Sequence, residues 1–550
     1  MSQNTFKLLS RSLEAEVEPM LIFEACRKYS HKDYRILLES SEQGTSGTQR
    51  SMLLLNQSLK IEARGFQVSI SPLNDNGRAA MDILSLELPK CIEDSVTFEL
   101  SDAEILLSYP DNRLIEEESI RIKRTTALDA IRQVLSILTK GNRLDAEKLL
   151  VAGVVGYDFI DSLELLPPVD FAEEDFPDFI FLLADSQIII DQTSNRIEIR
   201  EIIFSGEGED FRIGQARGRL NSLEEVLLEN SSASISDLKN YRPAGLVGEA
   251  VKVYPEACDF KNDVLKVKEA IAKGQIFQTV ISRNFTLNCS DTILAYQFLK
   301  QQNPSPYQFY LQLGEYTLFG ASPESSLRYQ QEQRSISIMP IAGTRKRGRY
   351  ASGEVNAELD ARLEADLILD EKELAEHLML VDLARNDLAR IAETGSRKVQ
   401  ELMSVYRYSA VMHMVSRISA TLRSGLDIYH ACQSCFHMGT LTGAPKKQAM
   451  ILIRELEQRR RGAYGGAVGY FNGAGDMDTA IVIRSALVKN NQATITAGAG
   501  IVADSTPENE LTETELKAAA VIKAIQYAED FNLTQTQIQT QTQTQIGDLS

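Results

Sequence analysis

The sequence predicts an α+β protein with antiparallel sheets. Two β-rich runs, Phe179–Asp191 and Arg196–Phe204, flank the turn-forming stretch 192–195 and predict a hairpin. Three further runs, 463–472, 477–488 and 492–502, follow one another with short polar turns between them. Strands joined in this way must be antiparallel, because a parallel pair needs a crossover of about a dozen residues or more. We therefore expect α+β rather than a doubly wound parallel fold.

Two further segments complete the predicted N-terminal half. Residues 95–109 alternate in the manner of a strand, and residues 125–138 are predicted as a helix laid on the sheet. The patterning then weakens over residues 229–255, which contain Asn-Ser-Ser and Arg-Pro-Ala-Gly stretches typical of a connection. We place there the boundary between an N-terminal region, 1–235, and a second region, 250–530.

The second region is predicted to begin with a helix and a strand. Apolar residues recur at helical spacing over 260–271, Gly274 supplies a stop signal, and a strand-like run follows over 276–283. Residues 370–390 form another helix candidate. A further helix is predicted to begin near Thr506-Pro507, which is a capping and first-turn signature.

The composition excludes several classes of partner. The chain has 550 residues, enough for two domains or one large composite core, and its 77 acidic and 58 basic side chains give a net charge of −19. No dense stripe of Lys and Arg could neutralise phosphates or anionic lipids, so we expect no nucleic-acid partner and no membrane partner. The start is rich in charges and no apolar run reaches membrane-spanning length, so we expect a cytoplasmic protein. Thr and Gln alternate over 534–546, which predicts a disordered tail at 534–550.

The six cysteines do not form a disulfide framework in so long a chain. Only Cys432 and Cys435 have suggestive spacing. A single Cys-x-x-Cys pair, even with His437 nearby, lacks the second pair of ligands that a zinc site needs. We therefore expect ordinary packing cysteines.

Two predicted helices each carry a pair of glutamates at i, i+3 spacing. Glu373 and Glu376 lie on one face of the first helix, and Glu510 and Glu513 on one face of the second. Four carboxylates at one site would repel one another unless a cation neutralised them, and Mg²⁺ suits such a site. The alternative is that both pairs lie on solvated helix faces, which are common.

An arginine and a stretch of small residues offer groups that bind carboxylates. Arg484 lies on an otherwise apolar run, where a buried guanidinium needs an anionic partner and an exposed one reaches solvent. Small residues at 497–500 let backbone N–H groups approach an anion closely. The third glycine of a dinucleotide fingerprint is absent there, and residues 439–446 fail the spacing of a phosphate loop, so ATP and NAD are disfavoured.

His413 lies among apolar neighbours, where a single histidine is more often a core residue than a catalyst. The ordinary pKa of histidine nevertheless lies near neutrality, as proton transfer at pH 7 requires. Paired acids for a metal, an arginine and a glycine stretch for carboxylates, and one titratable histidine together suit a small dianionic substrate.

From about residue 255 to residue 527 the chain resembles the chorismate-utilising enzymes. The stretches that carry the resemblance are 304–307, 320–324, 340–345, 373–387, 439–445, 464–466, Arg484 and 498–513. The resemblance implies that family's α+β fold, in which orthogonally packed antiparallel sheets form a sandwich with helices outside.

Carried over residue by residue, the resemblance implies a set of site residues. The ligands of Mg²⁺ are Glu376 and Glu513, with Glu510 joining them directly or, like Glu373, through water. The substrate contacts are Gly343, Thr344, Tyr464, Arg484, Gly498, Ala499 and Gly500. The catalytic candidates are His413, Glu373 and Thr440, and we assign His413 to loss of the C4 hydroxyl of chorismate or to the later elimination of pyruvate.

Two positions distinguish among the reactions of this family. Isochorismate and salicylate synthases carry a water-activating lysine where this chain has Gln278, and aminodeoxychorismate synthases typically carry a nucleophilic lysine where it has Ala342. Ammonia is nucleophilic enough to add without a covalent enzyme intermediate, so the absence of both lysines favours formation of anthranilate. The alternatives are an aminodeoxychorismate synthase component I and a non-catalytic tryptophan-binding regulator with this fold.

Residues 37–40 resemble the tryptophan-binding signature of anthranilate synthases. The resemblance assigns L-tryptophan, as a feedback inhibitor, to Glu39, Ser40, Pro306, Tyr307 and Gln308. The family commonly has methionine where Gln308 stands. Some aminodeoxychorismate synthases keep a structural tryptophan site, so the signature alone does not decide the product.

The source of nitrogen is expected to be a separate protein. The chain has no Gly-x-Cys-x-Gly nucleophile stretch and no segment that resembles a glutaminase domain. We therefore expect a glutamine amidotransferase subunit, component II of the enzyme, to deliver ammonia within a heterotetramer.

Overall fold

The computed structural model describes residues 4–40, 50–115, 117–169, 175–231, 241, 250–350, 352–408 and 411–547, with side chains as far as residue 534. Every pairing between named strands is antiparallel, which confirms the predicted fold class. The predicted hairpin forms as β8 (Phe179–Asp191) and β9 (Arg196–Phe204). Within the described residues, no helix is long and apolar enough to span a bilayer.

The first sheet combines strands from both halves of the chain. In order of pairing its strands are β1 (Phe6–Glu14), β9, β8, β3 (Arg50–Arg64), β2 (Tyr34–Ser40), β12 (Tyr307–Leu313), β13 (Tyr316–Ser322), β22 (Ser485–Lys489), β23 (Gln492–Ile501), β11 (Gln278–Asn288) and β10 (Lys252–Tyr254). The short strand β19 (Gly443–Ala444) also pairs with β11.

The second sheet is built in the same mixed way. In order of pairing its strands are β5 (Thr97–Leu100), β6 (Ile105–Ser108), β4 (Gln67–Pro72), β3, β8, β7 (Leu150–Val155), β20 (Ala467–Asn472), β21 (Met477–Ile481), β14 (Ser325–Gln330), β15 (Ser335–Ile338) and β18 (Val411–Thr421). Strands β16 (Ile341–Lys346) and β17 (Lys398–Arg407) pair with β18 as well.

The two sheets are continuous through β3 and β8. The pairing of these two strands shifts register between Leu54 and Leu59. Before the shift β3 pairs with β2 and after it with β4, while β8 changes partner from β7 to β9 at the same place. Bulges bend strands, and a bent strand that passes from one sheet into another forms the corner of an orthogonal sandwich. Apolar side chains of both sheets, including Phe309 and Val154, fill the space between them.

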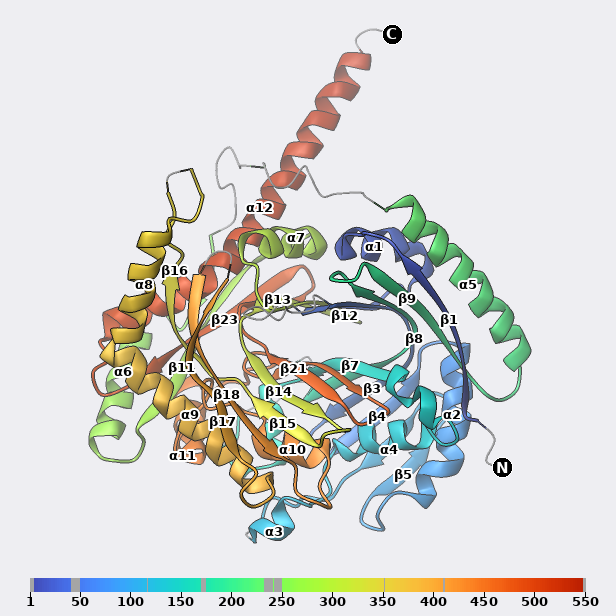
Figure 1. Ribbon diagram of the computed structural model, residues 1–550, viewed down its shortest axis with the longest axis horizontal. Helices are drawn as coiled ribbons and strands as arrows, with labels where there is room; N and C mark the ends of the chain where they lie inside the picture. Colours follow the sequence, from blue (N-terminus) through green and yellow to red (C-terminus); the bar gives the residue numbers. More distant parts are fainter. Residues whose placement is uncertain are drawn as a thin grey trace.

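Helices cover the outside of the sandwich (Figure 1). Those on the first sheet are α1 (Pro19–Ala25) with the 3-10 turn η1 (Cys26–Tyr29), α5 (Glu209–Glu229), α7 (Thr292–Gln302) and α12 (Pro507–Gly547). Those on the second are α2 (Asp75–Glu87), α4 (Asp129–Leu138), α9 (Glu371–Ile391) and α10 (Ile428–Cys435). The remaining elements are α3 (Glu118–Arg121), α6 (Ala257–Ala272), α8 (Ala357–Leu369), α11 (Lys446–Glu457), η2 (Leu88–Lys90), η3 (Arg143–Lys148) and η4 (Tyr157–Ser162).

The predicted regions 1–235 and 250–530 do not form separate cores. Strand β2 pairs with β12, and β7 pairs with β20, so both sheets contain strands from both regions. Most of the predicted connection, 232–240 and 242–249, lies outside the described residues.

The predicted disorder at 534–550 is not seen over residues 534–547, where α12 continues as a helix to Gly547 (Figure 1). Residues 548–550 lie outside the described residues. Extending a helix that is already packed costs far less than starting one, so low apolar content does not end it.

Candidate functional site

The two predicted pairs of glutamates meet. Helix α9 begins where the Asp370 side chain accepts hydrogen bonds from the first-turn N–H groups, and it presents Glu376 toward the start of α12. Burial raises the pKa of Glu376, and repulsion by Glu373, Glu513 and Glu510 raises it further. Burial likewise raises the pKa of Glu510. Four carboxylates that influence one another in this way occupy one site rather than two solvated helix faces.

Basic side chains balance much of this negative charge. Lys372 Nζ lies 3.6 Å from Glu376 Oε1, and Arg345 Nη1 lies 3.3 Å from Glu373 Oε1. In the described residues no three His, Cys, Asp or Glu side chains are gathered closely enough to hold a metal ion as they stand. One observation nevertheless fits a cation, because Glu510 Oε2 is buried and has no hydrogen-bond partner. Carboxylate oxygens are also the ligands that Mg²⁺ prefers.

The predicted glycine stretch lies on β23, against Tyr464. A Cβ added to Gly498 would lie 2.7 Å from the Tyr464 hydroxyl, so only glycine fits there. A Cβ added to Gly500 would lie 2.8 Å from Gln278 Nε2. The Gln278 side chain is buried and its Oε1 has no hydrogen-bond partner, so this amide is available to a ligand over Gly500. The Ala499 side chain packs on the opposite face, against α6, and only its backbone can contact substrate.

Arg484 enters the site from a bend, not from a strand face. The predicted run 477–488 is interrupted between β21 and β22, and Arg484 has a left-handed backbone with φ 52°. Its Nη1 donates to the Lys517 carbonyl oxygen at 2.9 Å. Burial lowers the pKa of Arg484, while Tyr464 and Glu513 oppose that change. The guanidinium is therefore beside the glutamates and not in bulk solvent.

His413 lies next to the predicted substrate loop. Strand pairing places it opposite Thr344, and its Nδ1 lies 2.9 Å from Thr344 Oγ1 and 3.3 Å from the Gly343 carbonyl oxygen. Gly343 has φ 74°, and a Cβ there would clash with Leu367 at 2.7 Å. Burial lowers the pKa of His413 to about 4. The expectation of an unperturbed histidine was therefore wrong, because desolvation disfavours imidazolium and keeps the ring neutral at pH 7.

Two groups at the site were missed by the sequence reasoning. Glu324, in the loop between β13 and β14, is buried, and burial raises its pKa to about 8 even though the Thr440 hydroxyl and Lys517 favour ionisation. Lys517 Nζ lies 2.5 Å from Glu513 Oε1 and donates to the Gly498 carbonyl oxygen at 2.9 Å. Its i, i+4 spacing from Glu513 on α12 was the available signal for Lys517. No local signal marks Glu324 as buried.

The predicted tryptophan residues are divided between two faces of the first sheet. Ser40 pairs with Tyr307, and Glu39 pairs with Gln308, so each pair shares a face and the two pairs face opposite ways. Pro306 immediately precedes β12. The side chains of these two pairs therefore point to opposite faces of the sheet, and the tryptophan site stays a prediction.

The side of the sheet that carries Glu39 faces α7. Lys300 Nζ lies 2.7 Å from Glu39 Oε1, and the Tyr296 hydroxyl donates to Glu39 Oε2 at 2.7 Å. The carboxylate of Glu39 is thus already engaged within the protein. On the other face, the Tyr307 hydroxyl donates to Asp478 Oδ1 at 3.3 Å.

Cys432 and Cys435 are buried and form no disulfide. Cys432 Sγ lies 3.3 Å from Met477 Sδ in the core of the second sheet. His437 instead contacts the Tyr157 carbonyl oxygen through Nε2 at 2.7 Å. These contacts are those of packing residues.

An orthogonal antiparallel sandwich, with paired glutamates and an arginine beside a glycine strand, agrees with what the resemblance to chorismate-utilising enzymes implies. The family model for chorismate binding enzymes matches residues 97–523, and the chain belongs to this family. It is 43% identical over 494 residues to anthranilate synthase component 1 of Escherichia coli K12, covering 90% of this chain and 92% of that one. It is 41% identical over 502 residues to anthranilate synthase component 1 of Vibrio cholerae, covering 90% and 91%.

Solved structures agree with this assignment. Anthranilate synthase component I from Streptococcus pneumoniae superposes with a TM-score of 0.62 at 27% identity, covering 86% of this chain and 92% of that chain. The menaquinone-specific isochorismate synthase of Escherichia coli superposes with a TM-score of 0.60 at 17% identity and supports the fold alone.

Proposed function

We propose that this chain catalyses the formation of anthranilate and pyruvate from chorismate and ammonia, as a Mg²⁺-dependent lyase at the start of tryptophan biosynthesis. The observation that carries the proposal is the meeting of two glutamate pairs beside Arg484, with a buried, protonated Glu324 in the same site. The similarity to anthranilate synthase component 1 proteins over about nine-tenths of the chain supports this choice within the family.

Glu376, Glu513 and Glu510 are the residues that would hold Mg²⁺, with Glu373 supporting them. The buried, unpartnered Oε2 of Glu510 supports this role. When bound, the ion would supply positive charge that stabilises a substrate carboxylate and the charge developing during the reaction. Lys372 contacts Glu376, and Lys517 contacts Glu513. These two lysines would offset the negative charge of the glutamates when Mg²⁺ does not.

Chorismate is a dicarboxylate, and the chain offers groups for its second carboxylate. Arg484 and the Tyr464 hydroxyl lie together against Gly498, where backbone N–H groups can approach closely. We assign the enolpyruvyl carboxylate to these two side chains. Holding both carboxylates fixes the ring relative to the catalytic groups and removes much of the entropic part of the barrier.

In the first step ammonia forms a bond to ring C2, both ring double bonds shift by one position toward C4, the C4–O bond breaks, and the added ammonium group gives up a proton to become an amine. The hydroxyl leaves as water if a neighbouring acid protonates it. Glu324 suits that role because its pKa of about 8 keeps it protonated at neutral pH. Thr440 lies near this carboxyl, and its buried hydroxyl has no hydrogen-bond partner among the described residues, so it would be available to contact the leaving hydroxyl.

In the second step the ring loses the C2 proton, the C–O bond to the enolpyruvyl group breaks, and the departing group takes up a proton as pyruvate. A neutral imidazole accepts a proton, whereas an imidazolium does not. The lowered pKa of His413, about 4, therefore supports a part in this elimination rather than in protonation of the C4 hydroxyl. Thr344, in contact with Nδ1, would fix the orientation of the ring.

Ammonia would come from a glutamine amidotransferase partner, as the name component 1 implies for the relatives, and we propose a heterotetramer in the cytoplasm. Feedback inhibition by L-tryptophan is part of the proposal. We propose that its site is formed by Glu39, Ser40, Pro306, Tyr307 and Gln308, and the pairing of β2 with β12, which brings Ser40 opposite Tyr307, supports this.

The test is a reaction of the purified chain with chorismate and Mg²⁺. Ammonium should give anthranilate and pyruvate in equal amounts, read by fluorescence and mass spectrometry, whereas glutamine alone should give neither. Accumulation of aminodeoxychorismate without pyruvate would contradict the proposal and favour the folate-pathway alternative. Absence of any product would contradict both.

A further inference from the structure

A cavity of about 690 Å³ lies beside Tyr464, which forms part of its lining. It extends from the turn between β22 and β23 inward along β23, and its lining includes Thr494, Thr496, Tyr464 and Ser485. The first two side chains share the strand face of Gly498, because alternate residues of a strand point the same way. The cavity and the proposed substrate wall are therefore successive parts of one sheet face, and the Tyr464 ring separates them.

The lining of this cavity is cationic. Arg459, Arg460, Arg461 and Lys489 line it, and Asp175 is the acidic residue among its lining. Such a surface attracts anions and raises their local concentration.

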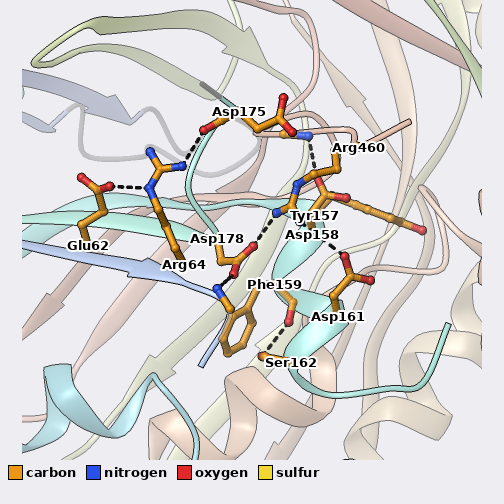
Figure 2. A network of polar contacts seen from close by, with 12 residues as sticks. Glu62, Arg64, Tyr157, Asp158, Phe159, Asp161, Ser162, Asp175, Asp178 and Arg460 are labelled. Carbon is orange, nitrogen blue, oxygen red and sulfur yellow. Dashed lines mark hydrogen bonds and ion pairs between the residues drawn. The ribbon is translucent and has the colours of Figure 1, made fainter. Parts of the chain in front are cut away.

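The acids that pair with two of these arginines do not line the cavity. Figure 2 shows Arg460 among Asp158, Asp161 and Asp178, which belong to η4 and the residue before β8. Arg461 pairs with the buried Glu457 at 2.6 Å. These carboxylates fix the arginines in place while leaving the cavity wall itself without their negative charge.

Arg459 is less completely engaged. Its Nη2 donates to Ser282 Oγ at 2.9 Å, and its nearest carboxylate, Glu457, is 3.7 Å away. Its Nε is buried and has no hydrogen-bond partner. The charge of Arg459 is therefore less fully neutralised by carboxylates than the charges of Arg460 and Arg461.

We propose that this cavity is the route by which pyruvate leaves the enzyme. The inference rests on the proposed function, which places the enolpyruvyl carboxylate at Tyr464 and Arg484. The C–O bond breaks at that end of the substrate, so pyruvate is released beside the inner end of the cavity. Near the inner end a small carboxylate meets Arg459, which contacts Ser282 opposite Gly498. Moving outward it passes the polar groups of Thr496 and Asn284, which hydrogen-bond each other at 2.8 Å, and then Lys489 at the end of β22.

The experiment separates the chemical step from release. Thr494→Trp narrows the cavity at its middle, and Thr97→Trp, on the exposed edge strand β5, is the matched control. In single turnovers with ammonium, anthranilate is followed by fluorescence and free pyruvate by lactate dehydrogenase and NADH. Since release of product can be slower than chemistry, Thr494→Trp should form anthranilate within about twofold of the wild-type rate but release pyruvate at least about fivefold more slowly.

A second variant, Arg459→Gln, removes one positive charge from the lining of the cavity without narrowing the cavity. Arg459→Gln should weaken product inhibition by added pyruvate about fivefold and leave the KM for chorismate unchanged, as expected for loss of one partly solvated charge. Arg196→Gln, at the exposed start of β9, should change neither quantity.

The outcomes are distinct. Simultaneous release of pyruvate and anthranilate in Thr494→Trp, or equal slowing of both, would overturn the proposed route, and so would unchanged pyruvate inhibition in Arg459→Gln. A wild-type chain that forms no anthranilate from ammonium would overturn the proposed function itself.

Discussion

Replacing Glu324 by Gln should impair catalysis and, at neutral pH, stabilise the protein. Burial raises the pKa of Glu324 from 4.5 to about 8, so roughly nine molecules in ten are protonated at pH 7. Gln keeps the shape but donates no proton to a leaving hydroxyl. Loss of a general acid typically lowers a rate by roughly 10²- to 10⁴-fold, and we expect kcat for anthranilate to fall in that range.

The effect on stability follows from the same pKa. Because the folded-state pKa lies above the unfolded one, this carboxyl favours the folded state fully below about pH 4.5, and that contribution is lost as pH rises toward about 8. Between pH 4.5 and pH 7 the free energy of unfolding of the wild-type protein therefore falls by about 3 kcal/mol because of this carboxyl. Glu324→Gln, which has no carboxyl at this position, does not show that decrease.

Two assays test this reasoning. Ammonia-dependent kcat is measured at pH 7, and the free energy of unfolding is obtained from urea titrations at pH 5 and pH 7. The stability of Glu324→Gln relative to wild type should increase between the two pH values. A variant with kcat within tenfold of wild type, or with a stability difference that does not change with pH, would refute a buried, protonated Glu324 as the acid.

Three further substitutions test other parts of the site. His413→Ala should slow elimination more than amination, so that the C2-aminated intermediate, 2-amino-2-deoxyisochorismate, is detected by chromatography with mass spectrometry ahead of anthranilate; normal anthranilate turnover would discard this role. Glu510→Gln should weaken Mg²⁺ binding roughly tenfold or more in calorimetry, because a ligand charge is lost; unchanged affinity would remove Glu510 from the ligand set. Gly498→Ala places a methyl group 2.7 Å from the Tyr464 hydroxyl and 2.9 Å from Val280 Cγ1, so it should lower thermal stability and raise the KM for chorismate, whereas an unchanged KM would show that this wall does not contact substrate.

Much of the fold could be predicted because its signals are local. The hairpin at 192–195, the capped helix after Asp370 and the Pro507 helix start all depend on neighbouring residues, and the structure has each of them. The glutamate pairs were visible because i, i+3 spacing fixes a common helix face whatever the helix packs against.

The rest depends on contacts between segments distant in sequence. The burial that raises the pKa of Glu324 and lowers that of His413 comes from other strands and helices, which no local pattern reports. The bend at Arg484 lies in a largely apolar run with no glycine or proline to mark it. Lys300 and Tyr296, which engage Glu39, come from a helix far along the chain.

The mixing of early and late strands within one sheet has a consequence for how the polypeptide matures during synthesis. Strands β22 and β23 lie between β13 and β11 in the first sheet, yet they are among the last to leave the ribosome. Until then β13 and β11 each present an unpaired edge, the kind of surface that joins other chains. We expect nascent chains that stop before about residue 480 to aggregate or to need chaperones, however complete their N-terminal half.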